Sequence, residues 1–221
     1  MEEFSLQIAG GTVAGLRSGT AGARRVLALH GWLDNAASFV PLAAHLEGVD
    51  LVAPDLPGHG RSFHLGQGAD YSFAGAVNTV LDIADALGWE RFSLLGHSMG
   101  AGIASLVAAG CPDRIERLVA IEALGALPEP AGRTTVRLRE AVAANRKLND
   151  KQLRVFADPA PAVRARMAAN ALGEASARLL VERGLRRVEG GFSWSSDPRL
   201  TLPTMVRMTP AQVDDLIAGI T

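Results

Sequence analysis

Residues 91–110 read RFSLLGHSMGAGIASLVAAG, and this stretch decides the fold. It opens with an apolar run at 92–95, too short for a helix, and closes with small apolar residues at 101–109 that have helical spacing. Between them lies GHSMG, residues 96–100, which has the pattern G-x-S-x-G. Between a strand and a helix, this pattern predicts a nucleophile elbow, a sharp turn that presents its serine at the end of the strand.

The steric demands of such a turn account for its glycines. A serine on so sharp a turn crowds the residues two before and two after it, and Gly96 and Gly100 have no Cβ atoms to clash. The turn also leaves the backbone N–H of Met99 free at the start of the next helix, directed to where an oxyanion would form. The alternative interpretation is a Gly-rich turn in which Ser98 has no chemical role.

Composition narrows the class of protein. The chain has 221 residues, 48% of them hydrophobic, and a net charge of −1, which allows one large domain and argues against a nucleic-acid partner. Its single cysteine, Cys111, excludes an internal disulfide. The acidic start at residues 1–4 is unlike a signal peptide, and no apolar run approaches a membrane span. We therefore expect a soluble cytoplasmic protein without membrane partners.

Apolar strands alternate with single helices over the first 124 residues. This order predicts an α/β fold with a mostly parallel sheet covered by helices on both faces. Alternating residues around Gly10-Gly11 add an N-terminal antiparallel hairpin. We expect the hairpin at 3–17, strands at 24–29, 50–53, 92–95 and 115–121, and helices at 36–47, between Ser72 and Gly88, and at 210–217.

Three strands are followed by loops rich in glycine and polar residues. These loops are His30-Gly31-Trp32, residues 54–62 and the GHSMG turn. Because ligands of open parallel sheets bind at the carboxyl ends of the strands, the three loops are expected to share a site.

The segment after Leu124 is rich in Ala and Arg. It predicts helices at 133–148, 150–157, 160–171 and 173–186 with no strand among them, and a return segment at 190–195. The arginines favour solvated helix faces; the sharper interpretation is a lid whose inner arginines bind an acidic substrate. They are Arg133, Arg137, Arg139, Arg146, Arg154, Arg164, Arg166, Arg178, Arg183, Arg186 and Arg187.

Together, the motifs resemble those of the α/β-hydrolase superfamily, and the chain is similar to serine hydrolase-like proteins and small esterases. The resemblance implies a hydrolase core at 1–124, a helical cap at 125–200 and a return to the core at 201–221. It implies Ser98 as the nucleophile, Met99 and Trp32 as donors of oxyanion N–H groups, and supporting roles for His30 and His97. It implies a small ester-like substrate and neither a metal nor an organic cofactor.

The chain departs from the family's order of serine, acid and histidine. No histidine follows His97, and the final helix resembles the one that precedes the acid-bearing strand, so two strands of the sheet are expected to be absent. The base could come from beyond residue 221, from another chain, or from His97 or His59. Glu122, at the end of a strand, is the catalytic acid, a hinge of the cap, or a loop carboxylate with a local hydrogen bond.

Two functions from different classes follow. The first is a serine hydrolase that acts on a carboxylic ester or related acyl substrate through a Ser98 acyl-enzyme. The second is a catalytically incomplete hydrolase-like fragment or binding module without its general base. In either case, the absent strands would expose one edge of the sheet, through which we expect self-association.

Overall fold

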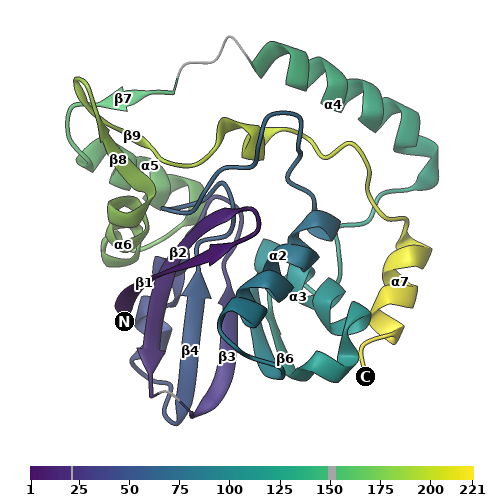
Figure 1. The fold of residues 1–221 in the computed structure, drawn as a ribbon. Helices are drawn as coiled ribbons and strands as arrows, with labels where there is room; N and C mark the ends of the chain where they lie inside the picture. Colours follow the sequence, from purple (N-terminus) through teal and green to yellow (C-terminus); the bar gives the residue numbers. More distant parts are fainter. Residues whose placement is uncertain (21, 149–152) are drawn as a thin grey trace.

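A six-stranded sheet forms the centre of the protein (Figure 1). The structure is a computed structural model that describes residues 1–20, 22–148 and 153–221. The strand order is β1-β2-β4-β3-β5-β6; β4, β3, β5 and β6 are parallel, and the N-terminal hairpin is antiparallel, which confirms the predicted α/β class. The strands are β1 (Glu2–Ile8), β2 (Gly11–Gly19), β3 (Arg24–Leu29), β4 (Val49–Pro54), β5 (Phe92–His97) and β6 (Ile115–Ile121).

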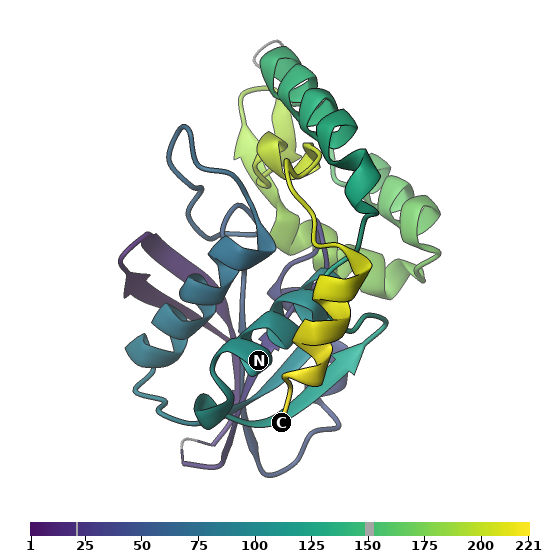
Figure 2. The same ribbon diagram turned by 90° about the vertical axis from the view of Figure 1, so that its right-hand side faces the viewer.

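Helices cover both faces of the sheet. On one face, α2 (Phe73–Ala86) and α3 (Met99–Gly110) pack against Leu27 and Leu29 of β3. On the other, the 3-10 turn η1 (Ala36–Phe39) and α1 (Val40–Ala43) pack against Ala28. A short 3-10 turn, η2 (Pro112–Arg114), precedes β6, and the last helix, α7 (Pro210–Ala218), packs beside α3 (Figure 2).

The expected helix at 36–47 is wrong in extent. Helical structure ends at Ala43, and the segment divides into a 3-10 turn and a single α-helical turn. Pro41 lies at the start of α1 and has no N–H, so it cannot continue the hydrogen bonds of the preceding turn. In contrast, α2 begins as expected, because the Ser72 side chain accepts a hydrogen bond from the Gly75 N–H.

A second group of elements lies over the carboxyl ends of the parallel strands (Figure 1). We call its described residues, 131–148 and 153–201, the cap. Three short strands form an antiparallel sheet in the order β7-β9-β8. The elements are η3 (Ala131–Arg133), α4 (Thr134–Leu148), β7 (Val155–Phe156), α5 (Ala160–Asn170), α6 (Glu174–Gly184), β8 (Leu185–Val188), β9 (Gly191–Trp194) and η4 (Pro198–Thr201).

The prediction of a strand-free cap is therefore wrong. The expected helix at 173–186 ends at Gly184, and the expected return segment is the second strand of a hairpin. Gly190 and Gly191 have φ values of +81° and +142°, so this glycine pair makes a turn that side-chain-bearing residues rarely adopt. The expected helix at 150–157 is contradicted at Val155–Phe156, which form β7, while residues 149–152 lie outside the described residues.

Across the described residues, the helices are all too short or too polar to cross a membrane. The sheet ends at β6, where Val119 and Ile121 are 53% and 43% exposed. Leu95, opposite Val119 on β5, is buried. The apolar face that η1 and α1 cover over β3 and β4 is thus open at β6, as an edge that could support the expected self-association would be.

We predict that Val119→Lys reduces self-association of the protein, because a lysine places a charge on this open face. Sedimentation velocity over a concentration series should give a smaller weight-average mass for the variant than for the wild type. Val206→Lys is the matched control, since Val206 is also exposed but lies outside β6. Indistinguishable masses for wild type and Val119→Lys would contradict an association through β6.

Candidate active site

Ser98 occupies a strained turn between β5 and α3. Its φ of +51° and ψ of −114° lie in a region that residues with side chains rarely adopt. The Ser98 N–H donates to the carbonyl of Ile121 at 2.9 Å, which ties the turn to the end of β6. The Ser98 side chain does not cap α3, so the hydroxyl is not engaged by the helix that follows.

The two glycines of the turn are required by close backbone contacts. A Cβ on Gly96 would lie 2.4 Å from the Cα of Ala101, and one on Gly100 would lie 2.0 Å from the carbonyl oxygen of Leu29. Both distances are far shorter than real Cβ contacts, and the opposing atoms are backbone. The elbow geometry expected from the GHSMG pattern is thus present, with the steric cause expected for it.

The loop after β3 lies beside the elbow. We call residues 30–36 the β3 loop. Leu33 has a φ of +58°, and the Asp34 N–H closes a turn on the carbonyl of Gly31 at 3.1 Å. Met99 is the first residue of α3, so its N–H has no acceptor within the helix. A Cβ on Gly31 would lie 3.0 Å from Nδ1 of His97, so the loop is adjacent to the elbow. The oxyanion roles of Trp32 and Met99 stay predictions.

His97 forms a cluster with two carboxylates near the elbow. Its Nε2 lies 3.1 Å from Oε2 of Glu122, and its Nδ1 lies 3.9 Å from Oδ2 of Asp34. Glu122 is largely exposed and has a φ of +71°. Its carboxylate thus makes a local contact with His97, while its role as catalytic acid stays open. The sequence had not indicated Asp34, because its partners are distant in the chain.

His30 and His59 are buried near the β3 loop. The Nε2 of His30 accepts from the N–H of Leu56 at 3.0 Å, so its Nδ1 carries the proton that binds the carbonyl of Gly31 at 2.8 Å. Burial disfavours the imidazolium; it is the largest cause that lowers the pKa of His30 to about 4 and that of His59 to about 3. Both rings are thus neutral near pH 7, and His30 supports the loop.

Asp55 links the β3 loop to the cap. Its buried carboxylate accepts from the N–H of Ala36 at 2.8 Å, from the N–H of Arg61 at 2.8 Å and from Nε of Arg183 at 2.8 and 3.0 Å. Arg183 is only 4% exposed, and its NH1 also donates to Glu3. Burial lowers the pKa of Arg183, but the hydrogen bonds with Asp55 and Glu3 outweigh it and raise that pKa overall.

The inner arginines of the cap have acidic partners within the protein. Arg183 pairs with Asp55, and Arg166 of α5 pairs with Asp34. Most of the other arginines are exposed, as expected for solvated helix faces. The described residues also include no histidine that is hydrogen-bonded to the Ser98 hydroxyl. The site thus combines a strained serine with nearby backbone N–H groups and carboxylates.

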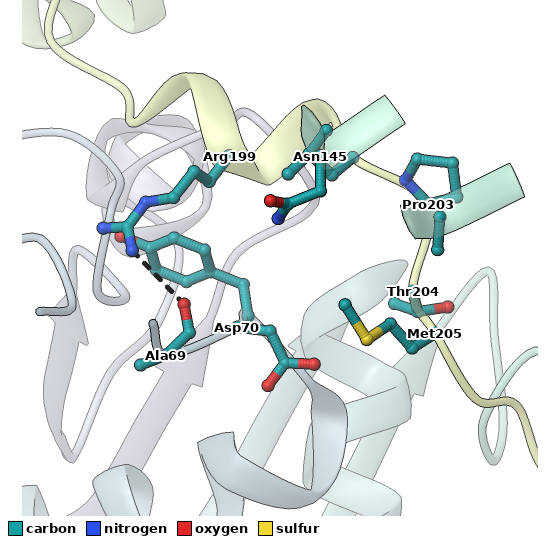
Figure 3. A pocket seen from close by; sticks show the side chains of 10 residues that line it. Ala69, Asp70, Asn145, Arg199, Pro203, Thr204 and Met205 are labelled. Carbon is teal, nitrogen blue, oxygen red and sulfur yellow. Dashed lines mark hydrogen bonds between the residues drawn. The ribbon is translucent and has the colours of Figure 1, made fainter. Parts of the chain in front are cut away.

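A small cavity of about 40 Å³ lies elsewhere, between α4, the loop before α2 and the segment after η4. Figure 3 shows Arg199 and Asn145 at this cavity, with the Arg199 guanidinium bound to the carbonyl of Ala69. Arg199 also binds Asp197, which accepts from the Tyr71 hydroxyl at 2.8 Å. The cavity has room for about one water molecule, and none of the expected site residues lines it.

Comparison with known proteins identifies the family. The sequence matches the alpha/beta hydrolase fold family over residues 24–186, which include β3, the elbow and most of the cap. The chain belongs to the α/β-hydrolase family. Among solved structures, a hypothetical protein of Pseudomonas aeruginosa PAO1 is 41% identical with a TM-score of 0.96, and it covers all of this chain and 79% of its own.

Other relatives of this α/β-hydrolase support the same placement. A thioesterase domain from the curacin biosynthetic pathway is 29% identical with a TM-score of 0.81, over all of this chain and 79% of that domain. A serine hydrolase-like protein of Danio rerio is 34% identical over 92% of this chain and 64% of the relative. One of Dictyostelium discoideum is 34% identical over 86% of this chain. The chain spans 55–64% of the length of these two curated relatives.

We predict that Gly100→Ala lowers the free energy of unfolding of this α/β-hydrolase by about 3 kcal/mol or more, since the new Cβ would overlap the backbone of Leu29. Urea unfolding followed by circular dichroism measures the change. Gly110→Ala is the matched control at the other end of α3, because a Cβ there meets no atom within 4 Å. It should stay within about 1 kcal/mol of wild type.

We also predict an acid-dependent loss of stability from the buried histidines. In the unfolded chain, His59 takes up a proton as the pH falls below its usual pKa of 6.5. In the native protein its pKa is about 3, so it stays neutral until the pH is much lower. Acid therefore favours the unfolded state, and the free energy of unfolding decreases. Each such histidine contributes about 1.4 kcal/mol per pH unit. Between about pH 7.5 and 5, His59→Asn should lose about 2 kcal/mol less than wild type in urea unfolding.

Asparagine suits this test because its amide can donate to the carbonyl of Pro57, as Nδ1 of His59 does at 3.1 Å. The exposed His45 provides the control variant His45→Asn, which should follow the wild type at both pH values. A His59→Asn protein with the same pH dependence as wild type would remove His59 as a source of the acid sensitivity.

Proposed function

We propose that the protein is a serine hydrolase that cleaves a carboxylic ester or related acyl substrate through an acyl-enzyme on Ser98. The observation that carries this proposal is the conformation of Ser98. Its positive φ is costly, and such strain persists mainly where it serves a site. In that conformation the hydroxyl projects from the turn between β5 and α3, next to the N-terminus of a helix whose N–H groups favour negative charge.

The reaction proceeds in two steps. The Ser98 oxygen attacks the acyl carbon as a base takes its proton, and the carbonyl oxygen becomes an oxyanion held by the N–H groups of Met99 and Trp32. The tetrahedral species collapses with departure of the alcohol, which receives the proton, and leaves the acyl group on Ser98. A water molecule then attacks the acyl-enzyme by the same route and releases the acid.

The general base is the part of this mechanism that the described residues do not provide. His30 and His59 are buried and held by backbone groups, and none of the described histidines, His97 included, is hydrogen-bonded to the Ser98 hydroxyl. We propose that a histidine outside residues 1–221, from a longer form of the chain or from a partner, completes the site. The alternative function is a hydrolase-like binding module; it differs in having no such histidine.

Fluorophosphonate labelling followed by intact-mass and peptide analysis tests this proposal. The Ser98 oxygen displaces fluoride from phosphorus, so the protein isolated in its natural form should gain one adduct, at Ser98. Ser98→Ala should abolish the adduct, while Ser5→Ala, at an exposed serine, should retain it. The 221-residue chain alone should react at least about 10³-fold more slowly, because it lacks the base.

Each outcome has a distinct meaning. An adduct at Ser98 in the natural protein but not in residues 1–221 supports both the nucleophile and the external base. Rapid labelling of the 221-residue chain places the base inside it. If the natural protein gains no adduct while its fold is intact, the serine-hydrolase proposal fails and the binding module remains.

A further inference from the structure

Three side chains of the β3 loop contact the cap, in addition to the contacts that the loop makes with the core. Trp32 donates from its indole Nε1 to the carbonyl of Leu200 in η4 at 2.8 Å. Asn35 donates from its side-chain amide to the carbonyl of Leu180 in α6 at 2.9 Å, and Asp34 pairs with Arg166 in α5. Three side chains that are nearly consecutive in one loop thus bind three different elements of the cap.

The loop is strained, so these contacts matter for its conformation. A leucine with a φ of +58° is in the left-handed region, which a side chain of this size disfavours. Such a conformation persists only where the surroundings hold it. Within the loop, the Asp34 N–H binds the carbonyl of Gly31, and the Ala37 N–H binds the Asn35 side chain at 3.1 Å. The cap contacts hold the same two residues, Asp34 and Asn35, from outside.

Of the three contacts between the cap and the β3 loop, the pair Arg166–Asp34 lies nearest to the elbow, because Asp34 also faces His97. Both side chains are largely buried, at 12% and 14% exposed. Burial disfavours the charge of Arg166 and lowers its pKa, and the carboxylate of Asp34 is the charge of opposite sign that it faces. The second oxygen of Asp34 lies toward His97, the neighbour of Ser98. A Cβ on Gly31 would come within 3.2 Å of the His97 ring and of the Asp34 carboxylate. The loop and the elbow are therefore in close contact at this point.

We propose that the cap is a positioning device for the oxyanion-binding loop, with Arg166 as the positioning residue that fixes the β3 loop through Asp34. The inference rests on the proposed function, since the loop matters for catalysis only if Trp32 donates to an oxyanion. Arg166 acts on the reaction through Asp34 and touches neither Ser98 nor the acyl group. The position of the cap therefore affects the rate of the acyl transfer through the β3 loop.

The first test is hydrogen exchange of the backbone amides in the natural protein, which needs no activity. In Arg166→Met, the amides of Asp34, Ala36 and Ala37 should exchange at least about 10-fold faster than in wild type, because the loop samples open states more often. Amides of β4 should not change. The matched control is Arg164→Met, because Arg164 lies two residues before Arg166 on α5 and is exposed. This variant should leave the loop amides protected.

The second test is steady-state hydrolysis of a neutral p-nitrophenyl ester. Arg166→Met should lower kcat about 10- to 100-fold with KM within about twofold, since a misplaced oxyanion donor weakens the transition state more than the bound ester. Arg166→Lys should recover part of kcat, because it keeps the charge opposite Asp34. A double variant, Asp34→Asn with Arg166→Met, should lose little more than the single variant, as expected for one shared interaction.

The two tests separate this inference from the proposed function. Unchanged loop exchange in Arg166→Met overturns the positioning role, whether or not the protein hydrolyses esters. Faster loop exchange with an unchanged kcat also overturns it, because the loop then has no part in the reaction. If the wild type is neither labelled at Ser98 nor active, the proposed function has failed, and the inference as stated fails with it even where the exchange shows that the cap holds the loop.

Discussion

The close approach of Gly100 to the end of β3 is the constraint on which the site depends. Because Gly100 has no side chain, the first turn of α3 packs directly against the backbone of Leu29, at a distance where a Cβ would overlap its carbonyl oxygen. This contact places the start of α3 beside the β3 loop. It also fixes Ser98 in its positive-φ conformation, because the turn has no room to relax.

Asp55 extends that arrangement to the cap. Its carboxylate is fully buried and receives hydrogen bonds from Ala36, Arg61 and Arg183, which belong to three different parts of the chain. Removing one partner from a buried ion pair costs about 3–5 kcal/mol, because the remaining charge stays in a medium of low polarity. If α6 moved away from the core, Asp55 would lose Arg183 and remain buried without an ion-pair partner. Because Asp55 also binds the N–H of Ala36, the position of the cap is coupled to the β3 loop.

The sequence predicted those elements that are determined by residues close to one another in the chain. The GHSMG turn and the Ser72 cap of α2 each depend on residues within a few positions of one another. The sequence did not predict the hairpin of β8 and β9, because the two consecutive arginines at 186 and 187 interrupt the alternation of apolar and polar residues that is typical of a strand. The pairs Asp55–Arg183 and Asn35–Leu180, 128 and 145 residues apart, have no local signal at all.

The pairing of the inner arginines changes what they imply about the substrate. Arg166 and Arg183 are largely buried cap arginines that face the core, where an acidic ligand could have been expected to bind. Arg137, which is as buried as Arg166, pairs with Glu129. Arg166 and Arg183 each face an aspartate of the core, so the charge is already balanced and an acidic ligand would have to displace that aspartate. Their positions are explained by the geometry of the loop and not by a charge on the substrate. The two arginines therefore give no indication that the ligand of this site is acidic.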